Sequence, residues 1–447
     1  MSGMCAKWAE PVRIAMPVLA VLLMTGCASA PGELPATTVL RAQRRAEAGR
    51  PLEERVDTIE RRLFTDFYEE SLGLITNFNV VRDGHTEKGP VDVEQSAHLL
   101  VGLACKYAAT GDPVAQERAR RLLTGLDSLD RANGLDGFLP LQVRAADGGV
   151  EVVSERFVSS SYTQLLYAEV LAWKLFSDPG LKEAIRTQAK RMLDHLLANN
   201  LVVVDGQGRP LPYSDSSVKR RVFGTGRELE TLSFVRAACF FGEDDPRRLE
   251  ALLALRKRIE EDYHYARMSF ILHVSVPLFE VPTPSSSWLN LMKLATLVET
   301  TGSGQYRRLL HGLADDYRAH QNPFFIALDL IHGPARSPES AAAQEKTARS
   351  RLETYPLTND STELQNLGRA PYRLRVPPHF VKSTLAFEAT RPVPFYDKAG
   401  DRYQWKRNLL LLDGNLGGDG RKVFSGVDCY EAYWMLAYAK TLRTGAK

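Results

Sequence analysis

The sequence has few cysteines, little net charge and, after its first residues, no long apolar run. It contains five cysteines in 447 residues and has a formal net charge of +3 at pH 7. Cys105, Cys239 and Cys429 lie in apolar helical contexts and are expected to be buried thiols, not a disulfide framework. Nucleic acid is not expected as a partner, because its binding needs clustered positive charge. No stretch after Met24 approaches the roughly 20 apolar residues that cross a bilayer, so we expect no transmembrane helix in the body of the chain.

Motifs of several enzyme classes are also missing. The chain has no His-Glu-x-x-His, Gly-x-Ser-x-Gly, P-loop or paired Cys-x-x-Cys motif, which disfavours zinc proteases, serine hydrolases of that type and nucleotide enzymes. Gly224–Gly226 lacks the third glycine and the preceding strand of a dinucleotide site. Asp413–Asp419 partly resembles a calcium loop, but Phe424 stands where the bidentate Glu belongs. We therefore expect neither a metal nor a cofactor.

The N-terminus carries a signal for export. Lys7 and Arg13 precede an apolar run over Ile14–Met24, which is too short to span a bilayer and is typical of a signal peptide. The run ends in Leu-Met-Thr-Gly-Cys at residues 23–27. This ending resembles the lipobox of bacterial lipoproteins, with Met where Leu is commoner. The resemblance implies a signal peptide over residues 1–26 and lipid on Cys27 that makes the membrane a partner.

Two other interpretations of this segment stay open, an ordinary secretory signal cleaved after Ala28 or Ala30 and a buried hairpin. Residues 27–51 are rich in Ala, Pro and Arg and show no apolar period. They predict a flexible tether with a reach of about 25 to 30 Å. We expect a lipid-anchored protein of the cell envelope, on the outer membrane facing the periplasm or the surface, with residues 52–447 as its folded domain.

Apolar residues recur at helical spacing through the rest of the chain. One such set contains Val93, Ala97, Leu100, Val101 and Ala104. The helices end in tight polar turns, four of which begin at positions 110, 177, 242 and 301. A spacing of about 60 to 67 residues is the signature of a repeat. Each repeat holds a helix, a short turn, a second helix and a long connection.

Two further helix pairs are predicted, one over Gln305–His332 and one from Ala341 to the last helix, Val427–Leu442. A long Pro-rich excursion interrupts the second pair. Twelve helices in six hairpins predict an all-α fold, an (α/α)6 toroid in which each hairpin buries its apolar face on its neighbours. Short turns are expected at one end of the ring and long loops at the other. An open α-solenoid is the alternative fold, and a closed ring fits the chain length better.

Four short motifs carry a resemblance to known proteins. They are the Thr-Gly-Asp turn after Tyr107, Asn133–Phe138, Asp205–Gly208 and Tyr433-Trp434. They resemble the six-hairpin glycosidase superfold, above all its little-characterised bacterial lipoproteins, over most of the mature chain. The resemblance implies a site at the loop-rich end of the ring. Relatives in the superfold include glycoside hydrolases, polysaccharide lyases and uronyl epimerases, so the resemblance does not select a reaction.

Candidate catalytic residues lie in the long loops and at the helix starts that follow them. Asp83 and His85 in the first loop could supply an acid and a base. Asp92 and Glu94 stand at the next helix start. The alternative is an Asp-Gly turn followed by acids that favour a helix N-terminus. Glu228, at a later helix start, is the expected partner carboxylate of Asp83.

Tyr162 could donate a proton or stack on a sugar from an inner helix, although a core position is the commoner role. A further set of arginines and tryptophans is expected to hold the sugar: Arg156, Arg221, Arg227, Arg407, Trp288 and Trp405. Arginine binds the carboxylate of a uronic acid through paired hydrogen bonds. The alternatives are a salt-bridged helix entry for the arginines and core packing for the tryptophans.

The leading functional hypothesis is a lipid-anchored envelope protein that hydrolyses a glycan, with Asp83 and Glu228 as paired carboxylates. A lyase or epimerase of the same fold, with Tyr162 or His85 as the base, is the first alternative. A non-catalytic glycan-binding or scaffold lipoprotein is the alternative from another class. An oligosaccharide or polysaccharide is the expected ligand, and the sequence names no protein partner.

Overall fold

The computed structural model describes residues 35–129, 135–146, 149–154, 159–199, 201–205, 207–215, 225–242, 250, 253–254, 284–362, 364, 371–375, 386–412 and 419–445. Most of these residues are helical. The helices are α2 (Pro35–Ala48), α3 (Leu52–Thr65), α4 (Val93–Thr110), α5 (Pro113–Leu129), α6 (Ser159–Leu175), α7 (Pro179–Ala198), α8 (Thr225–Phe241), α11 (Pro284–Thr301), α12 (Gly304–Asp316), η1 (Arg318–His320), α13 (Pro323–His332), α14 (Pro338–Leu352), η2 (Phe395–Asp397), η3 (Gln404–Lys406) and α15 (Val427–Thr444). The strands are β1 (Tyr68–Glu69), β2 (Leu74–Ile75), β3 (Asn79–Arg82), β4 (His85–Lys88), β5 (Val91–Asp92), β6 (Gln142–Ala146), β7 (Gly149–Ser154), β8 (Val202–Val204), β9 (Pro210–Asp215), β10 (Tyr372–Arg375), β11 (Ala386–Ala389) and β12 (Lys422–Val423).

The helices form two concentric layers. The inner layer consists of α4, α6, α8, α11, α13 and α15, each of which contacts the next. Because α15 also contacts α4, the inner layer is a closed ring. On the outside, α5 packs on α4, α7 on α6, α12 on α11, α14 on α13 and α3 on α15. The described helices therefore form the predicted (α/α)6 toroid, and the contact between α4 and α15 distinguishes it from an open solenoid.

Burial along the sequence separates the two layers. In α4 every residue from Val93 to Cys105 is buried, as expected of a helix that is covered on all sides. In α5 the buried positions Ala115, Ala119, Leu122 and Leu126 recur every three or four residues. The outer helix α5 thus presents one apolar face to the ring and leaves the other to solvent.

The four predicted turns fall where inner helices end. These helices are α4, α6, α8 and α11, which end at Thr110, Leu175, Phe241 and Thr301. Gly111 ends α4 with a φ of 71°, in the left-handed region that favours glycine. The Asp178 side chain caps α7 by accepting a hydrogen bond from the Leu181 amide. The predicted helix, turn and second helix are confirmed after α4, α6 and α11, whereas residues 243–249, which follow α8, lie outside the described residues.

The pairing of the later helices differs from the prediction. The expected pair over Gln305–His332 contains α12 and α13, but α12 packs on α11 and α14 packs on α13. The outer partner of the last helix, α15, is α3 near the other end of the chain. Val56, Ile59 and Leu63 of α3 are buried, so α3 has an apolar face that needs a neighbour. The ring is therefore closed by helices from both ends of the chain.

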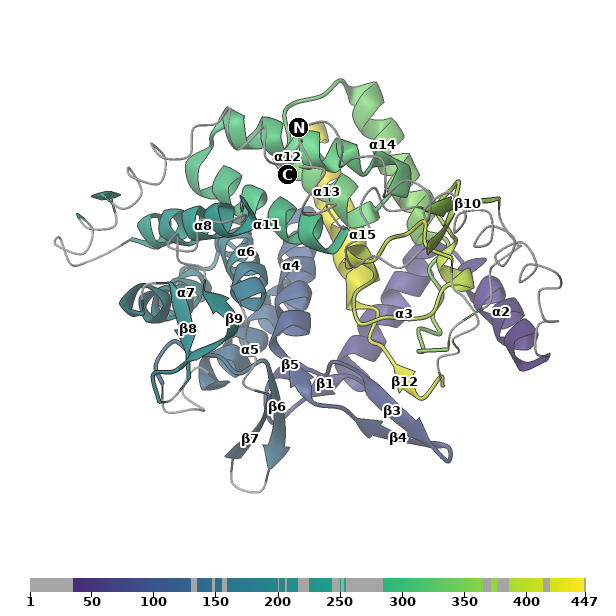
Figure 1. The fold of residues 1–447 in the computed structure, drawn as a ribbon, viewed down its shortest axis with the longest axis horizontal. Coiled ribbons are helices and arrows are strands. Elements are labelled where there is room, and N and C mark those ends of the chain that lie inside the picture. Colours follow the sequence, from purple (N-terminus) through teal and green to yellow (C-terminus); the bar gives the residue numbers. More distant parts are fainter. Residues whose placement is uncertain are drawn as a thin grey trace, which may run out of the picture.

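The long connections contain small sheets, five of them among the described residues. Figure 1 shows that the β3–β4 and β6–β7 hairpins extend from the end of the ring at which α4 and α15 begin. Strand β12 pairs with β3, so that Lys422 lies opposite Val80 and Val423 opposite Asn79. The loop ahead of α15 is thereby joined to the loop ahead of α4. The end at which these inner helices begin is rich in long loops, as predicted.

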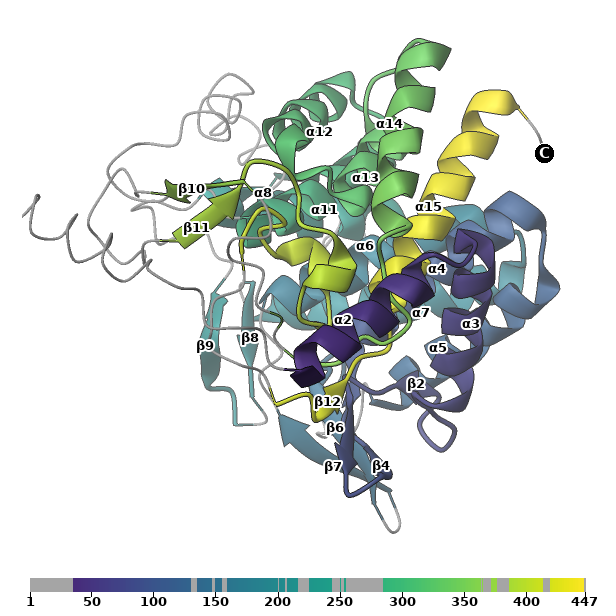
Figure 2. The same cartoon turned by 90° about the vertical axis from the view of Figure 1, so that its right-hand side faces the viewer.

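Helix α2 corrects part of the predicted tether. Residues Pro35–Ala48 are helical and lie along the outside of the body (Figure 2). The fully buried Arg44 donates hydrogen bonds to Asp360 Oδ1 at 2.8 Å and to the carbonyl oxygen of Lys398 at 2.7 Å. A buried guanidinium that lost these partners would be strongly destabilising. This part of the expected flexible segment is therefore docked on the folded body.

The predicted N-terminal export signal lies outside the described residues, which begin at 35. The predicted signal peptide and the lipid on Cys27 therefore stay predictions. Among the described helices, none combines the length and the apolar character needed to cross a membrane.

Candidate functional site

Two carboxyl groups lie at the start of α4, at the loop-rich end of the ring. Asp92 caps the helix, with Oδ1 accepting a hydrogen bond from the Gln95 amide and Oδ2 accepting one from Gln142 Nε2, both at 3.1 Å. Glu94 Oε1 accepts a hydrogen bond from Ser161 Oγ at 2.6 Å. Asp92 is fully buried, whereas Glu94 keeps 9% of its surface exposed. Glu94 is therefore the member of the pair that a ligand can reach.

The buried position of Asp92 changes its acidity. Burial and, next, the negative charge of Glu94 raise the pKa of Asp92 to about 6, although Arg402 and the hydrogen bonds to Asp92 act in the opposite direction. Asp92 thus keeps its proton in mildly acidic solution, where an ordinary aspartic acid is ionised. A carboxyl group held neutral beside a second carboxyl group is an arrangement that acid–base catalysis uses.

Two cations from the Pro-rich excursion lie next to these acids. The Arg402 guanidinium is 3.8 Å from Asp92 Oδ2 and 3.9 Å from Glu94 Oε2. Lys406 is close enough for its charge to interact with Arg402, with Asp401 and, more weakly, with both acids. Burial and, next, the charge of Arg402 lower the pKa of Lys406. We call these four side chains, Asp92, Glu94, Arg402 and Lys406, the charged cluster.

Three buried residues, Tyr403, Gln404 and Trp405, connect the excursion to the ring, and we call them the plug. The Gln404 amide donates to Asp428 Oδ2 at 2.8 Å, and Trp405 Nε1 donates to the Asp428 carbonyl oxygen at 2.9 Å. Asn322 Nδ2 donates to the Trp405 carbonyl oxygen at 2.8 Å. Asn322 caps α13 and Asp428 lies in the first turn of α15. The plug is therefore held by the starts of two inner helices.

Tyr403 also ties the plug to α4 and α6. Its ring stacks on the imidazole of His98 at 3.9 Å, and its hydroxyl donates to Glu431 Oε2 at 2.7 Å. His98 Nδ1 lies 3.0 Å from Glu431 Oε1, and His98 Nε2 lies 3.1 Å from Gln164 Oε1. All four side chains are buried. Because Arg402 and Lys406 flank the plug, this network sets where the two cations of the charged cluster lie.

The structure places the predicted residues Asp83 and His85 on the β3–β4 hairpin, which projects from the ring (Figure 1). Both are exposed. Asp83 and Gly84 have φ values of 50° and 78°, the left-handed pair of a two-residue hairpin turn. This is the Asp-Gly turn of the alternative interpretation. The catalytic roles of Asp83 and His85 stay predictions, and the described contacts bring neither residue to the charged cluster.

Several residues expected to meet the sugar have other positions. Tyr162 and Trp405 are fully buried in the core, and a ring without exposed surface does not stack on a sugar. Both therefore have the core role that the sequence left open. Trp288 is 4% exposed, and its ring lies 5.0 Å from that of Tyr403. Arg407 is exposed and pairs with Asp401.

Other predicted site residues fall in parts of the chain that the structure does not describe. Arg156 and Arg221 lie outside the described residues, as does most of the calcium-like segment. Arg227 and Glu228 lie in the first turn of α8, but their side chains are outside the described part. Glu228 is thus at the start of an inner helix, as expected. Its separation from any other carboxyl group stays a prediction.

Sequence reasoning missed Arg402 and Lys406. The segment Asp401–Arg407 contains three cations and two aromatic residues within a Pro-rich excursion, and this density was the available signal. From this segment, only Trp405 and Arg407 were predicted to be site residues. Nothing local shows that the flanking cations meet acids more than 300 positions earlier in the chain.

The cysteines do not contribute a nucleophile to this cluster. Cys105 and Cys429 are buried thiols, as expected, and Cys239 is partly buried. Burial raises the pKa of Cys105 and Cys429 well above the usual thiol range. Thiols that resist ionisation are poor nucleophiles, so both act in packing.

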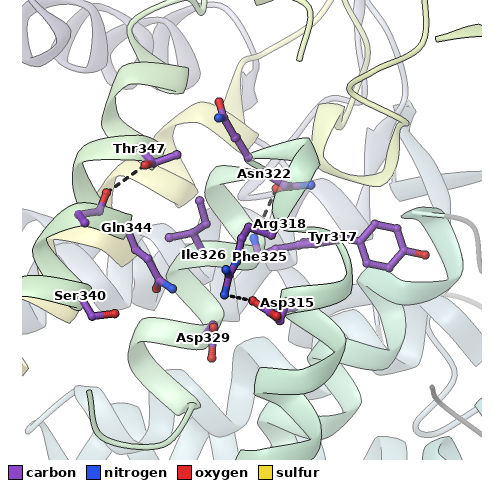
Figure 3. A pocket seen from close by; sticks show the side chains of 13 residues that line it. Asp315, Tyr317, Arg318, Asn322, Phe325, Ile326, Asp329, Ser340, Gln344 and Thr347 are labelled. Carbon is purple, nitrogen blue, oxygen red and sulfur yellow. Dashed lines mark hydrogen bonds and ion pairs between the residues drawn. The ribbon is translucent and has the colours of Figure 1, made fainter. Parts of the chain in front are cut away.

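A cavity of about 310 Å³ lies between α13, α14 and η1 (Figure 3). Its walls include Arg318, Phe325, Asp329 and Gln344. In Figure 3, Gln344 extends from α14 toward α13. None of the four residues of the charged cluster lines this cavity.

Comparison with known proteins found similarity in fold alone. No family model matches the chain, and no curated protein matches it. An inactive variant of the α-1,6-mannanase GH76A of Salegentibacter sp. HEL1_6, in complex with α-1,6-mannotetrose, is 13% identical, with a TM-score of 0.46 over 88% of this chain and 99% of that chain. An endoglucanase from the termite Nasutitermes takasagoensis is also 13% identical, with a TM-score of 0.41 over 92% of this chain and 99% of that chain. The fold of this protein, by its own helix contacts, is an (α/α)6 toroid.

Proposed function

We propose that this protein hydrolyses a glycan, with Glu94 as one catalytic carboxylate and Glu228 as the other. The observation that carries the proposal is the charged cluster, in which a reachable Glu94 lies beside the buried acid Asp92 and the cation Arg402. Most glycoside hydrolases need two carboxyl groups, one as acid and one as base or nucleophile. Glu94 and Glu228 lie in the first turns of the inner helices α4 and α8. Glu94 replaces Asp83 in the pair expected from the sequence.

Each residue of the cluster has a separate role in this proposal. The hydroxyl of Ser161 holds Glu94 by a hydrogen bond of 2.6 Å, which orients its free oxygen toward a ligand. Asp92 is a positioning residue, because it is fully buried and acts on the substrate only through its neighbours. Loss of its proton near pH 6 places a second negative charge beside Glu94. We therefore expect the rate to change around this pH, and we expect Asp92→Asn to remove that change.

The test compares Glu94→Gln and Glu228→Gln with wild type for release of reducing sugar ends from a panel of polysaccharides. Each substitution should lower kcat/KM by about 100- to 10,000-fold, the usual contribution of a catalytic acid or base. Glu87→Gln, which changes an exposed residue on β4, is the matched control. Full activity of Glu94→Gln would overturn the assignment. Loss of activity in Asp83→Asn together with full activity in Glu94→Gln would instead support Asp83 and Glu228, the pair expected from the sequence.

A lyase or epimerase is a second candidate, favoured by one observation. Burial and the charge of Arg402 lower the pKa of Lys406, and a lysine that loses its proton more easily can act as a base. A lyase would release an unsaturated sugar that absorbs ultraviolet light, and Lys406→Met would abolish its formation. A glycan-binding protein without catalysis would bind oligosaccharide equally well as wild type and as Glu94→Gln, with no turnover by either.

We further infer that the protein works at a membrane, held by lipid on Cys27. The support is the lipobox-like sequence at residues 23–27. Because helix α2 begins at Pro35 and its buried residues begin at Arg41, residues 28–34 are the stretch left between Cys27 and this helix. These residues span at most about 25 Å when fully extended. The substrate is therefore expected to lie at the envelope surface.

A further inference from the structure

Arg402 forms long ion pairs with Asp92 and Glu94 but donates no hydrogen bond to either acid. Its guanidinium nitrogens lie 3.8 and 3.9 Å from the oxygens of Asp92 and Glu94, which is longer than a hydrogen bond. One third of its side chain is exposed, at 33%. The donors of Arg402 are therefore available to a ligand that approaches Glu94.

Lys406 is a second cation at the same place. Within the part of the chain that the structure describes, its ammonium group makes no hydrogen bond and no ion pair, and the residue is partly buried. The ammonium nitrogen is not among the fully buried atoms that lack a partner, so a ligand can reach it from solvent. Arg402 adds repulsion, since its charge lowers the pKa of Lys406. An anion bound between the two cations would offset this repulsion.

The plug fixes the backbone from which the side chains of both cations extend. Tyr403 and Trp405 are buried and hydrogen-bonded to Glu431 and Asp428 of α15. Arg402 precedes Tyr403 directly, and Lys406 directly follows Trp405. A site whose groups are already ordered loses little conformational entropy on binding, so the arrangement is suited to recognition of one ligand group.

We propose that Arg402 and Lys406 form a subsite for the carboxylate of a uronic acid unit in the glycan. A guanidinium can donate two parallel hydrogen bonds to a carboxylate, and an ammonium group adds a compact point charge. The neighbouring Glu94 would then meet the linkage next to that unit. The proposal rests on the proposed function for this role of Glu94 and identifies the class of substrate. A neutral sugar would leave Lys406 without a partner and Arg402 with only its long ion pairs to Asp92 and Glu94, which a polar site disfavours.

Calorimetry with the full chain tests the subsite without measuring turnover. The probes are short oligosaccharides of glucuronate, galacturonate and mannuronate, each compared with its own methyl ester, which removes the charge and keeps the shape. At least one acid should bind tenfold or more tightly than its ester, as hydrogen bonds to charged groups imply. Arg402→Gln and Lys406→Met should each lose this preference. Arg421→Gln, which changes an exposed arginine on another loop, should keep it.

The outcomes separate the subsite from the proposed hydrolysis. If Glu94→Gln keeps the preference for the acid but wild type hydrolyses no glycan, the subsite stands and the proposed function fails. If no acid is preferred over its ester, or Arg402→Gln keeps the preference, the subsite is overturned. Equal competition by inorganic sulfate would overturn the assignment to a carboxylate. Thermal unfolding of each variant shows whether it is folded, and Lys406→Arg should restore binding in part if charge is what matters.

Discussion

At the scale of single residues, Asp428 connects helix α15 of the ring to the plug, and its protonation affects the stability of the folded protein. It accepts hydrogen bonds from the Tyr355 hydroxyl at 2.7 Å, the Gln404 amide at 2.8 Å and the Cys429 amide at 2.9 Å. Burial raises the pKa of Asp428 to about 6, although these hydrogen bonds oppose the shift. The folded protein therefore holds a proton on Asp428 at pH values at which the unfolded chain has released it.

We expect Asp428→Asn to reduce the pH dependence of stability between about pH 4 and 6. The stabilisation of the folded protein by the raised pKa is fully present below about pH 4. It is lost as the pH rises through about 6, because ionisation of Asp428 then favours the unfolded chain. A shift from 3.8 to about 6 corresponds to about 3 kcal/mol. Urea unfolding across this window measures the slope for wild type and variant, with Asp57→Asn on the exposed face of α3 as the control. Equal slopes in wild type and Asp428→Asn would contradict the assignment.

At the scale of elements, α4 and α15 pack more closely than ordinary side chains allow. Gly102 lies in α4 and faces Tyr430 of α15, which is fully buried. A Cβ atom at Gly102 would lie 2.7 and 2.8 Å from two carbons of the Tyr430 ring. These distances are shorter than van der Waals contact between carbons. The glycine thus allows the contact that closes the ring.

Gly102→Ala should destabilise the protein by about 1 to 3 kcal/mol, the usual effect of overpacking a core. Alanine favours a helix by about 1 kcal/mol over glycine, so a loss of stability would show that packing outweighs helix propensity. Gly304→Ala is the matched control, because its Cβ would meet nothing nearer than Arg308 Nη1 at 3.7 Å. Urea unfolding at constant pH measures both. If the free energy of unfolding of Gly102→Ala equals that of wild type, α4 and α15 can move apart without a loss of stability.

The helices also show which features of the fold depend only on residues close together in the sequence. The ends of α4 and α11 were predicted from turn residues in the sequence, and the structure has the helix ends at these positions. The partner of α15 is different, because α3 and α15 come together only when the ring closes. Helix α2 was not predicted from the sequence, for a similar reason. Its buried side includes Arg44, and an arginine is recognised as a core residue only when its partner, Asp360, is known.

At the scale of the whole molecule, α2 and α3, the first two helices of the described residues, belong to the body of the protein. Helix α3 closes the ring against α15, and α2 docks next to α3 against the excursion. A lipid on Cys27 would therefore pull on a segment that is fixed a few residues later. The body would stay near the membrane and would have less freedom than a tether over residues 27–51 allows.

We expect Cys27→Ser to release the protein from the membrane. In a bacterium that processes lipoproteins, wild type should take up labelled palmitate and sediment with the membrane fraction, whereas Cys27→Ser should do neither. Cys5→Ser, which changes a cysteine ahead of the apolar run, is the matched control and should behave as wild type. Palmitate on the Cys27→Ser protein would contradict the lipobox interpretation.

The sequence by itself determined the repeated helices, their turns and the loop-rich end, because helical periodicity and turn chemistry act between residues close along the chain. It also pointed to Glu94 and to the segment that contains Trp405. The tertiary structure decided that α15 pairs with α3, that Trp405 is core, and that Arg402 meets Asp92 and Glu94. The contacts of α3 with α15 and of Arg402 with the two acids join residues more than 300 positions apart. Such contacts depend on the closing of the whole ring, which no local pattern encodes.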